Sequence, residues 1–217
     1  IPENVCFHFE IAGDILDDES IEILNSAPKG SIQLEIGMQS FNEKTLAYIN
    51  RKTNTEKLIR NIKKLLSPGN LHIHIDLIAG LPFEDLESFE RSFDIGYNLR
   101  SNMLQLGFLK LLHGAQMRED SEKYPCIFSK EPPYEVISTQ WTDENDLLLL
   151  HKIEDALERL CNSGRFIGTV DYVIESGDMP GIDVSDILKL IDPKITKKQE
   201  LEAQVIELEK QIKSKTN

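Results

Sequence analysis

The chain has 217 residues, of which 40% are hydrophobic and 28% are charged, so it can form one good core or two small ones. Its formal net charge of −13 disfavours nucleic acid as a partner, because that affinity depends on lysine and arginine neutralising phosphates. No apolar run approaches the ~18 residues of a membrane span, and no secretory signal precedes the first strand, so we expect a cytoplasmic protein without membrane contact. The three cysteines, Cys6, Cys126 and Cys161, match no disulfide or metal spacing and should be free thiols. The opening Ile-Pro, without an initiator Met, is typical of a fragment of a longer protein.

Strand and helix patterns alternate through the first half of the chain. Asp17 and Asn42 are placed to cap helices, and Thr53 with Glu56 forms a capping box at the start of a third helix. Such an order with short links predicts right-handed βαβ units, and hence a partial TIM-type (β/α) barrel of parallel strands; a small open doubly wound sheet is the alternative. Strands are predicted at 4–11, 31–37, 71–78 and 103–109, and helices at 18–26, 43–49, from 53 onward and at 85–99.

The second half of the chain predicts a helical C-terminal extension. A rigid Pro-Pro break at 131–134 precedes a long amphipathic helix at 143–161, for which Thr142 is the expected cap. Short helices are expected over 165–191, and the last helix, 196–214, carries a brief coiled-coil-like seam that needs a partner. The predicted domains are therefore a half barrel (1–118), a helical accessory domain (119–191) and a short terminal helix (192–217).

Alternation within the first three strands gives each an apolar and a polar face. Because side chains alternate across a strand, the apolar faces should be covered by helices and the polar faces should line one groove. Leaving these polar groups buried without partners would cost about 1–3 kcal/mol each, so the groove must hold water, a polar ligand or a mutual network. The polar set is His8, Glu10, Gln33, Glu35, Gln39, His72, His74 and Asp76.

Four segments carry a family resemblance. They read IQLEIGMQSF (32–41), LAYINR (46–51), IHIDLIAGLPFE (73–84) and LQLGFLKLLHG (104–114). Together they resemble the central segment of radical S-adenosylmethionine (SAM) enzymes of the coproporphyrinogen-oxidase and B12-binding type. The resemblance covers roughly residues 3–118, and the segment after it resembles the accessory C-terminal domain of cobalamin-binding members.

The resemblance implies a SAM-binding role for five residues. Glu10 would face the amino or ribose groups, Gln39 and Arg51 the methionine carboxylate and ribose side, and Asp76 the ribose hydroxyls. The backbone around Leu109 would pack on the adenine or bond to it. No catalytic residue and no metal ligand is assigned in this chain.

The resemblance also implies what is missing. Such enzymes bind a 4Fe-4S cluster through a C-x3-C-x2-C loop, and this sequence contains no such triplet. The longer parent would reductively cleave SAM to a 5′-deoxyadenosyl radical and abstract hydrogen from an unknown small-molecule substrate; whether it uses cobalamin stays open. The chain by itself should be inactive.

Two other classes of function remain open. A metal-dependent hydrolase barrel would use His72 and His74, whose H-x-H spacing suits zinc. A non-catalytic module would self-associate through the terminal helix or through the open sheet edges of a half barrel. Self-association by these surfaces is also expected of the radical SAM fragment.

Overall fold

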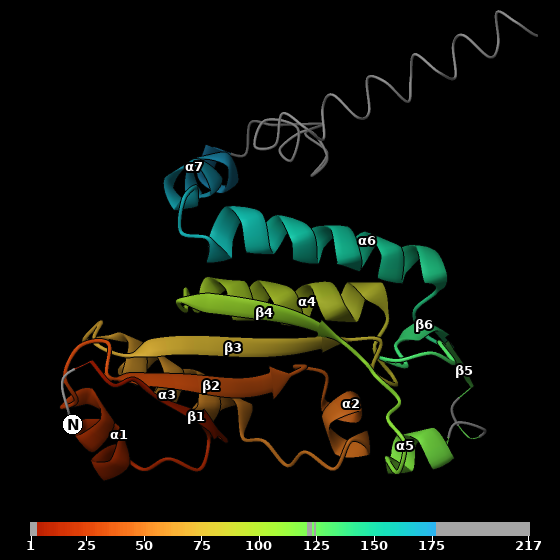
Figure 1. The fold of residues 1–217 in the computed structure, drawn as a ribbon, viewed down its shortest axis with the longest axis horizontal. Helices are drawn as coiled ribbons and strands as arrows, with labels where there is room; N and C mark the ends of the chain where they lie inside the picture. Colours follow the sequence, from red (N-terminus) through yellow and green to blue (C-terminus); the bar gives the residue numbers. More distant parts are fainter. Residues whose placement is uncertain (1–3, 121–122, 124, 177–217) are drawn as a thin grey trace, which may run out of the picture. The chain divides into compact units, whose positions relative to one another are not determined.

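The computed structural model describes residues 4–120, 123 and 125–176, so the predicted terminal helix and the segment 177–191 lie outside the described residues. The chain divides into two compact units, 1–162 and 163–217. In the first unit the strands β1 (Phe7–Ile11), β2 (Ile32–Gln39), β3 (His72–Ala79) and β4 (Met103–Phe108) form one parallel sheet in that order (Figure 1). The predicted α/β fold with a partial barrel of parallel strands is confirmed.

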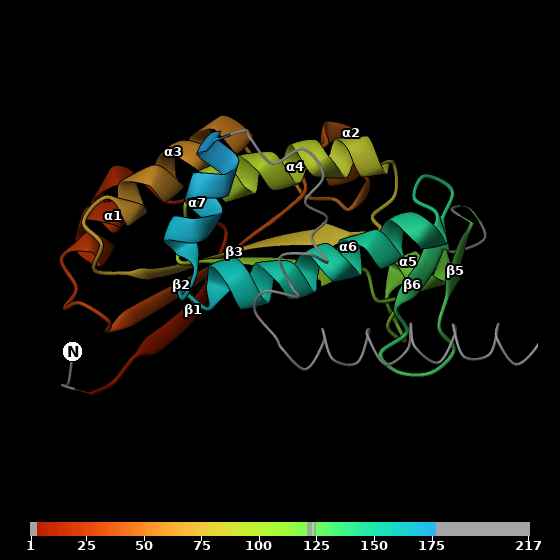
Figure 2. The ribbon, with the colours of Figure 1, turned by 90° about the horizontal axis from the view of Figure 1, so that it is seen from above.

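Helices cross between successive strands and cover one face of the sheet (Figure 2). They are α1 (Asp18–Asn25), α2 (Glu43–Tyr48), α3 (Thr55–Leu66) and α4 (Leu86–Asn98). Their apolar faces bury residues such as Ile21, Ile62 and Phe89 against the aliphatic side of the sheet. This packing leaves the other side of the sheet to the polar residues.

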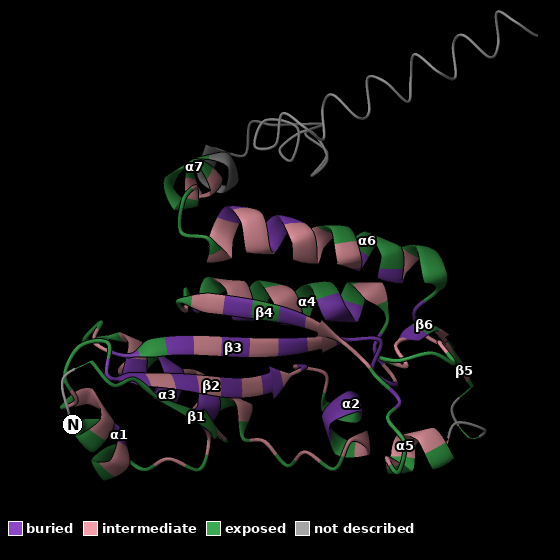
Figure 3. Ribbon diagram, viewed as in Figure 1, coloured by how far each residue is buried: buried purple, intermediate pink, exposed green. Residues whose placement is uncertain are grey.

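The two central strands show the predicted alternation in full. On β2, buried residues alternate with partly exposed ones, and on β3 Ile73, Ile75 and Leu77 have no exposed surface (Figure 3). Both strands have a neighbour on each side and helices over one face, so their aliphatic side chains form the centre of the core. The core therefore fixes which side of the sheet the polar side chains line.

The outer face of β1 departs from the prediction. Val5, Phe7 and Phe9 were expected under helices, but they are 41%, 41% and 45% exposed, and the rings of Phe7 and Phe9 stack on one another. The reason is position in the sheet: β1 is an edge strand that pairs only with β2. Among the described helices, α1 buries Ile21 in the shared core and leaves this phenylalanine row uncovered.

The helix starts are correctly predicted for α1 and α2 and wrong for α3. Asp17 accepts a hydrogen bond from the backbone of Ser20, and Asn42 accepts from Lys44, so both act as N-caps. At α3 the N-cap is Asn54 rather than Thr53, because the side-chain Oδ1 of Asn54 accepts from the Lys57 N–H. Asparagine is at least as good an N-cap as threonine, so Asn54 caps the helix in place of the predicted Thr53.

The segment after the sheet combines a short hairpin with a long helix. The predicted helical extension includes an antiparallel pair that the sequence did not indicate, β5 (Cys126–Phe128) with β6 (Val136–Thr139). The short helix α5 (Gln116–Glu119) precedes it, and α6 (Glu144–Ala156) follows and runs into a π-helical turn, η1 (Leu157–Asn162). The N-cap of α6 is Asp143, not Thr142, whose hydroxyl instead donates to the Glu84 carbonyl oxygen.

The described part of the second unit contains α7 (Ile167–Ser176). Through the described residues, no helix combines the length and apolar character that crossing a membrane requires.

Candidate functional site

An open cavity of about 270 Å³ lies where β1, β2 and β3 end. The register explains the meeting of their side chains, because Glu10 pairs with Glu35 across β1 and β2, and Gly37 pairs with Asp76 across β2 and β3. Four of the five predicted SAM ligands therefore line one space. The lining residues are Glu10, Ile11, Ala12, Glu35, Gly37, Gln39, Arg51 and Asp76.

Gln39 reaches the cavity through an irregular end of β2. The pairing of β2 with β3 shifts register between Gly37 and Gln39, and Gln39 has a left-handed backbone with φ of 66°. Non-glycine residues adopt this conformation rarely, and such outliers concentrate at functional sites. The turn folds the Gln39 amide back over Gly37, where a Cβ atom would overlap it.

Arg51 reaches the same place from the end of α2. The Asn50 N–H bonds the Ala47 carbonyl at 3.2 Å, and the Arg51 N–H bonds the Leu46 carbonyl at 2.9 Å, with Asn50 left-handed at φ of 56°. This pair of bonds is a Schellman motif, which ends a helix and turns the chain sharply. From this turn the Arg51 guanidinium donates to the Gly37 carbonyl oxygen.

The acidic groups of the cavity act on one another. Burial, and then the negative charges of Glu35 and Glu10, raise the pKa of Asp76 to about 6, while Arg51 acts in the opposite direction. Glu35 also pairs with His8, whose Nε2 lies 3.1 Å from Glu35 Oε2. The cavity lining is therefore mainly acidic and should attract cationic groups, and among its residues Arg51 supplies the one positive charge.

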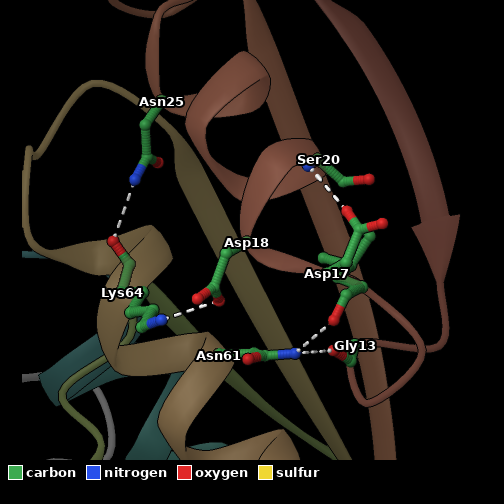
Figure 4. A network of polar contacts seen from close by, with 8 residues as sticks. Gly13, Asp17, Asp18, Ser20, Asn25, Asn61 and Lys64 are labelled. Carbon is green, nitrogen blue, oxygen red and sulfur yellow. Dashed lines mark hydrogen bonds and ion pairs between the residues drawn. The ribbon is translucent and has the colours of Figure 1, made fainter.

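The loop that follows β1 and supplies Ala12 is tied to helix α3. The buried Asn61 side chain donates to the carbonyl oxygens of Gly13 at 2.9 Å and Leu16 at 3.0 Å (Figure 4). The same figure shows the neighbouring bond between Lys64 and Asp18, at 2.7 Å. A Cβ on Gly13 would come within 2.8 Å of the Leu58 side chain, so a larger residue there would force this buried leucine to shift. The cavity wall is therefore held by core packing.

Leu109 is not among the residues that line the cavity. It follows β4, its N–H donates to the Ala79 carbonyl at 2.9 Å, and its carbonyl accepts from Val136 at 2.9 Å. Its N–H is therefore already used within the protein. The adenine contact assigned to this backbone stays a prediction.

His8, His72 and His74, on the polar face of the sheet, do not form a metal site with other described residues. The rings of His72 and His74 lie 4.8 Å apart, and His74 lies 6.4 Å from His8. Burial lowers the pKa of His74, as does the neighbouring His72. The hydrolase alternative needs a third ligand that this part of the chain does not provide.

Gly37 lines the site and Glu84 lies close to it in the sequence, but no role was predicted for either residue. A glycine on the polar face of β2, two residues before Gln39, was the available signal for a close approach of side chains. Glu84 belongs to the DLIAGLPFE segment, but its complete burial could not be expected of a glutamate.

The arrangement defines a class: a parallel α/β sheet with a polar cavity at the carboxyl ends of its strands. Comparison with known families makes the class specific. Residues 1–95 match the family described as the Radical SAM superfamily, and residues 122–182 match a protein family of unknown function, DUF4080. Over residues 1–95 the chain is therefore similar to radical SAM proteins.

Two curated proteins are similar to this chain. The oxygen-independent coproporphyrinogen-III oxidase-like protein HemZ of Bacillus subtilis is 26% identical over 70% of this chain and 30% of its own length. The tRNA-2-methylthio-N(6)-dimethylallyladenosine synthase of Endomicrobium trichonymphae is 37% identical over 35% of this chain and 18% of its own length. The chain thus spans less than a third of either relative.

A solved structure shares the fold. The coproporphyrinogen III oxidase HemN from Escherichia coli, a radical SAM enzyme, matches with a TM-score of 0.50 and 19% identity, over 68% of this chain and 31% of its own. At this identity the match supports the partial barrel fold and nothing about substrate.

Proposed function

We propose that the cavity at the ends of β1, β2 and β3 binds S-adenosylmethionine, and that the chain provides this part of the cofactor site of a radical SAM enzyme. One observation carries the proposal: carboxylates, an amide and a guanidinium from segments far apart in the sequence converge on one cavity. These groups belong to Glu10, Glu35, Asp76, Gln39 and Arg51.

The charges of the cavity complement those of SAM. The cofactor carries a cationic sulfonium and ammonium, which suit the acidic side formed by Glu10 and Asp76. It also carries a carboxylate, which suits the planar guanidinium of Arg51. The bond from Arg51 to Gly37 uses one of five N–H donors, and it aims the group along the cavity wall.

Unpartnered acceptors support the same assignment. Gln39 Oε1 and Asp76 Oδ1 are buried and accept no hydrogen bond from any described residue. Leaving such an atom unsatisfied costs about 1–3 kcal/mol, so the cavity favours a ligand with donors at these places. Ribose hydroxyls and an ammonium group are donors of this kind, and the residues present therefore fit SAM.

The residues of this chain do not fit the iron–sulfur cluster. The sequence holds three cysteines and no C-x3-C-x2-C triplet, and Cys6 precedes β1, whereas Cys126 lies on β5 and Cys161 in η1. The cluster supplies the electron for cleavage of SAM, so we propose that its cysteines come from polypeptide other than these 217 residues. The chain alone would then bind the cofactor without cleaving it.

We propose a small-molecule substrate for the complete enzyme. The net charge of −13 disfavours a polyanion such as tRNA, although one similar protein acts on it by name. An oxidoreductase of the coproporphyrinogen-oxidase-like kind agrees better with this charge.

Equilibrium dialysis with radiolabelled SAM tests the binding proposal. We expect saturable binding of one SAM per chain, weakened about tenfold or more by Arg51→Ala, which removes the carboxylate partner. Glu87→Gln, on the exposed side of α4, is the matched control and should bind like the wild type. Absence of saturable binding, or equal binding by Arg51→Ala, would contradict the proposal.

A further inference from the structure

Glu84 is the one ionisable side chain among the buried polar residues described, with 1% of its surface exposed. It ends the loop after β3, outside the cavity lining. Its Oε1 accepts hydrogen bonds from the hydroxyls of Ser40 at 2.6 Å and Ser92 at 3.1 Å. Its Oε2 accepts none from the described residues. A carboxyl group in such a place needs an explanation beyond packing.

The carboxyl group fixes the segment that follows β2. Ser40, which donates to Glu84, also accepts from the Asn42 N–H at 2.9 Å. Ser92, on α4, accepts from the Phe41 N–H at 2.9 Å. The backbone of residues 40–42 is thus tied to α4 through one acceptor oxygen.

These hydrogen bonds lie at the start of residues 39–51, the segment that contains the cavity residues Gln39 and Arg51. Gln39 immediately precedes Ser40, and Asn42 begins α2, at whose end Arg51 emerges. The Asn42 amide donates to the Phe83 carbonyl at 2.8 Å, which joins the start of α2 to the Glu84 loop a second time. Moving the segment would therefore move both Gln39 and Arg51.

Backbone conformation points to the same junction. Gln39 and Phe83 are both left-handed, with φ of 66° and 65°, and each lies directly before a member of the Ser40–Glu84 pair. Such conformations persist only where the surroundings impose them. The Ser40–Glu84 bond joins the two strained turns.

We propose that Glu84 is a positioning residue of the cavity: its carboxyl group holds residues 39–51 against α4, so that Gln39 and Arg51 face the ligand. Glu84 itself touches no ligand. This inference rests on the proposed function for what the positioned residues bind, but the positioning can be measured without any ligand.

The buried carboxyl also gives the segment a pH dependence. Burial raises the pKa of Glu84 to about 7; the hydrogen bonds from Ser40 and Ser92 oppose this, and the charge of Asp85, the N-cap of α4, adds to it. Opening the segment exposes the carboxyl to water, where it ionises more readily. Opening should therefore become easier as the pH rises toward 8, and tighter closure is expected near pH 5.

Amide hydrogen exchange of residues 40–51 tests the inference in the full chain. After correction for intrinsic rates, protection in the wild type should fall about tenfold or more between pH 5.5 and pH 8, whereas Glu84→Gln should show a flat profile. Glu87→Gln, at an exposed position of α4, should keep the wild-type profile. Ser92→Ala removes one donor and the acceptor of Phe41, and should lower the protection of Phe41 and Asn42 at every pH.

The outcomes separate this inference from the proposed function. An identical pH profile in the wild type and Glu84→Gln would overturn the positioning role, whatever SAM does. If Glu84→Gln does not fold, unchanged protection in Ser92→Ala overturns it equally. Loosening of residues 40–51 in a chain that does not bind SAM would sustain the positioning role and contradict the proposed function instead.

Discussion

The side-chain amide of Asn162 makes both hydrogen bonds that a neighbouring strand would make with Leu104. Leu104 N–H donates to Asn162 Oδ1 at 3.1 Å, and Asn162 Nδ2 donates to the Leu104 carbonyl at 2.9 Å. Leu104 lies on β4, the edge strand opposite β1, so the π-helical turn covers part of a free edge. Free edges pair readily with other chains, and this contact closes one of them.

Asn162→Ala should therefore destabilise the protein and uncover the β4 edge. Loss of both bonds to Leu104 should lower the free energy of unfolding by about 1–3 kcal/mol, which urea denaturation measures. Sedimentation velocity should show more self-association than in the wild type. The control is Asn98→Ala, an exposed position of α4, and equal stability of the two variants would show that the edge contact contributes nothing.

Gly37→Ala should weaken SAM binding while leaving the fold intact. The new methyl group would overlap the Gln39 amide and approach Arg51 Nη2 at 3.1 Å, but both are flexible side chains that can move aside. We expect about tenfold weaker binding by calorimetry with a melting temperature within a few degrees of the wild type. Gly168→Ala on α7, where a Cβ meets nothing within 4 Å, is the matched control. Unchanged binding in Gly37→Ala would show that the Gln39 and Arg51 positions do not matter.

Binding of SAM should weaken at acid pH because of Asp76. A cationic ligand favours the ionised carboxylate, and the pKa of Asp76 is raised to about 6, so protonation below that value removes an attractive charge. For one such group the dissociation constant should rise about tenfold from pH 8 to pH 5. Asp76→Asn should bind weakly with a flatter profile, while Asp94→Asn, on the exposed face of α4, should follow the wild type. If the affinity of the wild type for SAM did not change between pH 8 and pH 5, Asp76 would not contact the ligand.

Stability should decrease from acid to neutral pH because of Glu84. Its folded pKa of about 7 exceeds the ordinary glutamate pKa of 4.5, so between these values the folded chain binds more protons than the unfolded chain. The free energy of unfolding then falls as the pH rises from about 4.5 to 7 and levels off above, by at most roughly 3 kcal/mol. Asp76 adds a loss of the same sign near pH 4 to 6. Urea unfolding at several pH values should show a smaller fall in the free energy of unfolding for Glu84→Gln than for the wild type. An equal pH dependence in the two proteins would show that Glu84 is not the cause.

The strand pattern was enough to predict the sheet and most of the cavity. Alternation alone placed Glu10, Gln39 and Asp76 on one face, because the period of a strand is two and its apolar side must be buried. Arg51 lies on no strand, and the resemblance to radical SAM sequences was needed to add it. The Schellman turn that aims it depends on Asn50, whose left-handed conformation is not visible in a pattern.

The remaining features depend on contacts between distant segments. Thr142 was expected to cap a helix, but its hydroxyl bonds the Glu84 carbonyl 58 positions earlier, and Asp143 caps instead. The exposure of Phe7 and Phe9 follows from the edge position of β1, which no local pattern contains. Local sequence predicts local structure here, and long-range hydrogen bonds decide between neighbouring candidates.

The most direct test of the central claim is a titration of the ¹⁵N-labelled chain with SAM, followed by two-dimensional NMR. We expect saturable shifts of the backbone amides of Glu10, Gly37, Gln39 and Asp76, and of the Arg51 side chain, with little change on the outer face of α3. Shifts confined to other surfaces, or none at millimolar SAM, would contradict it.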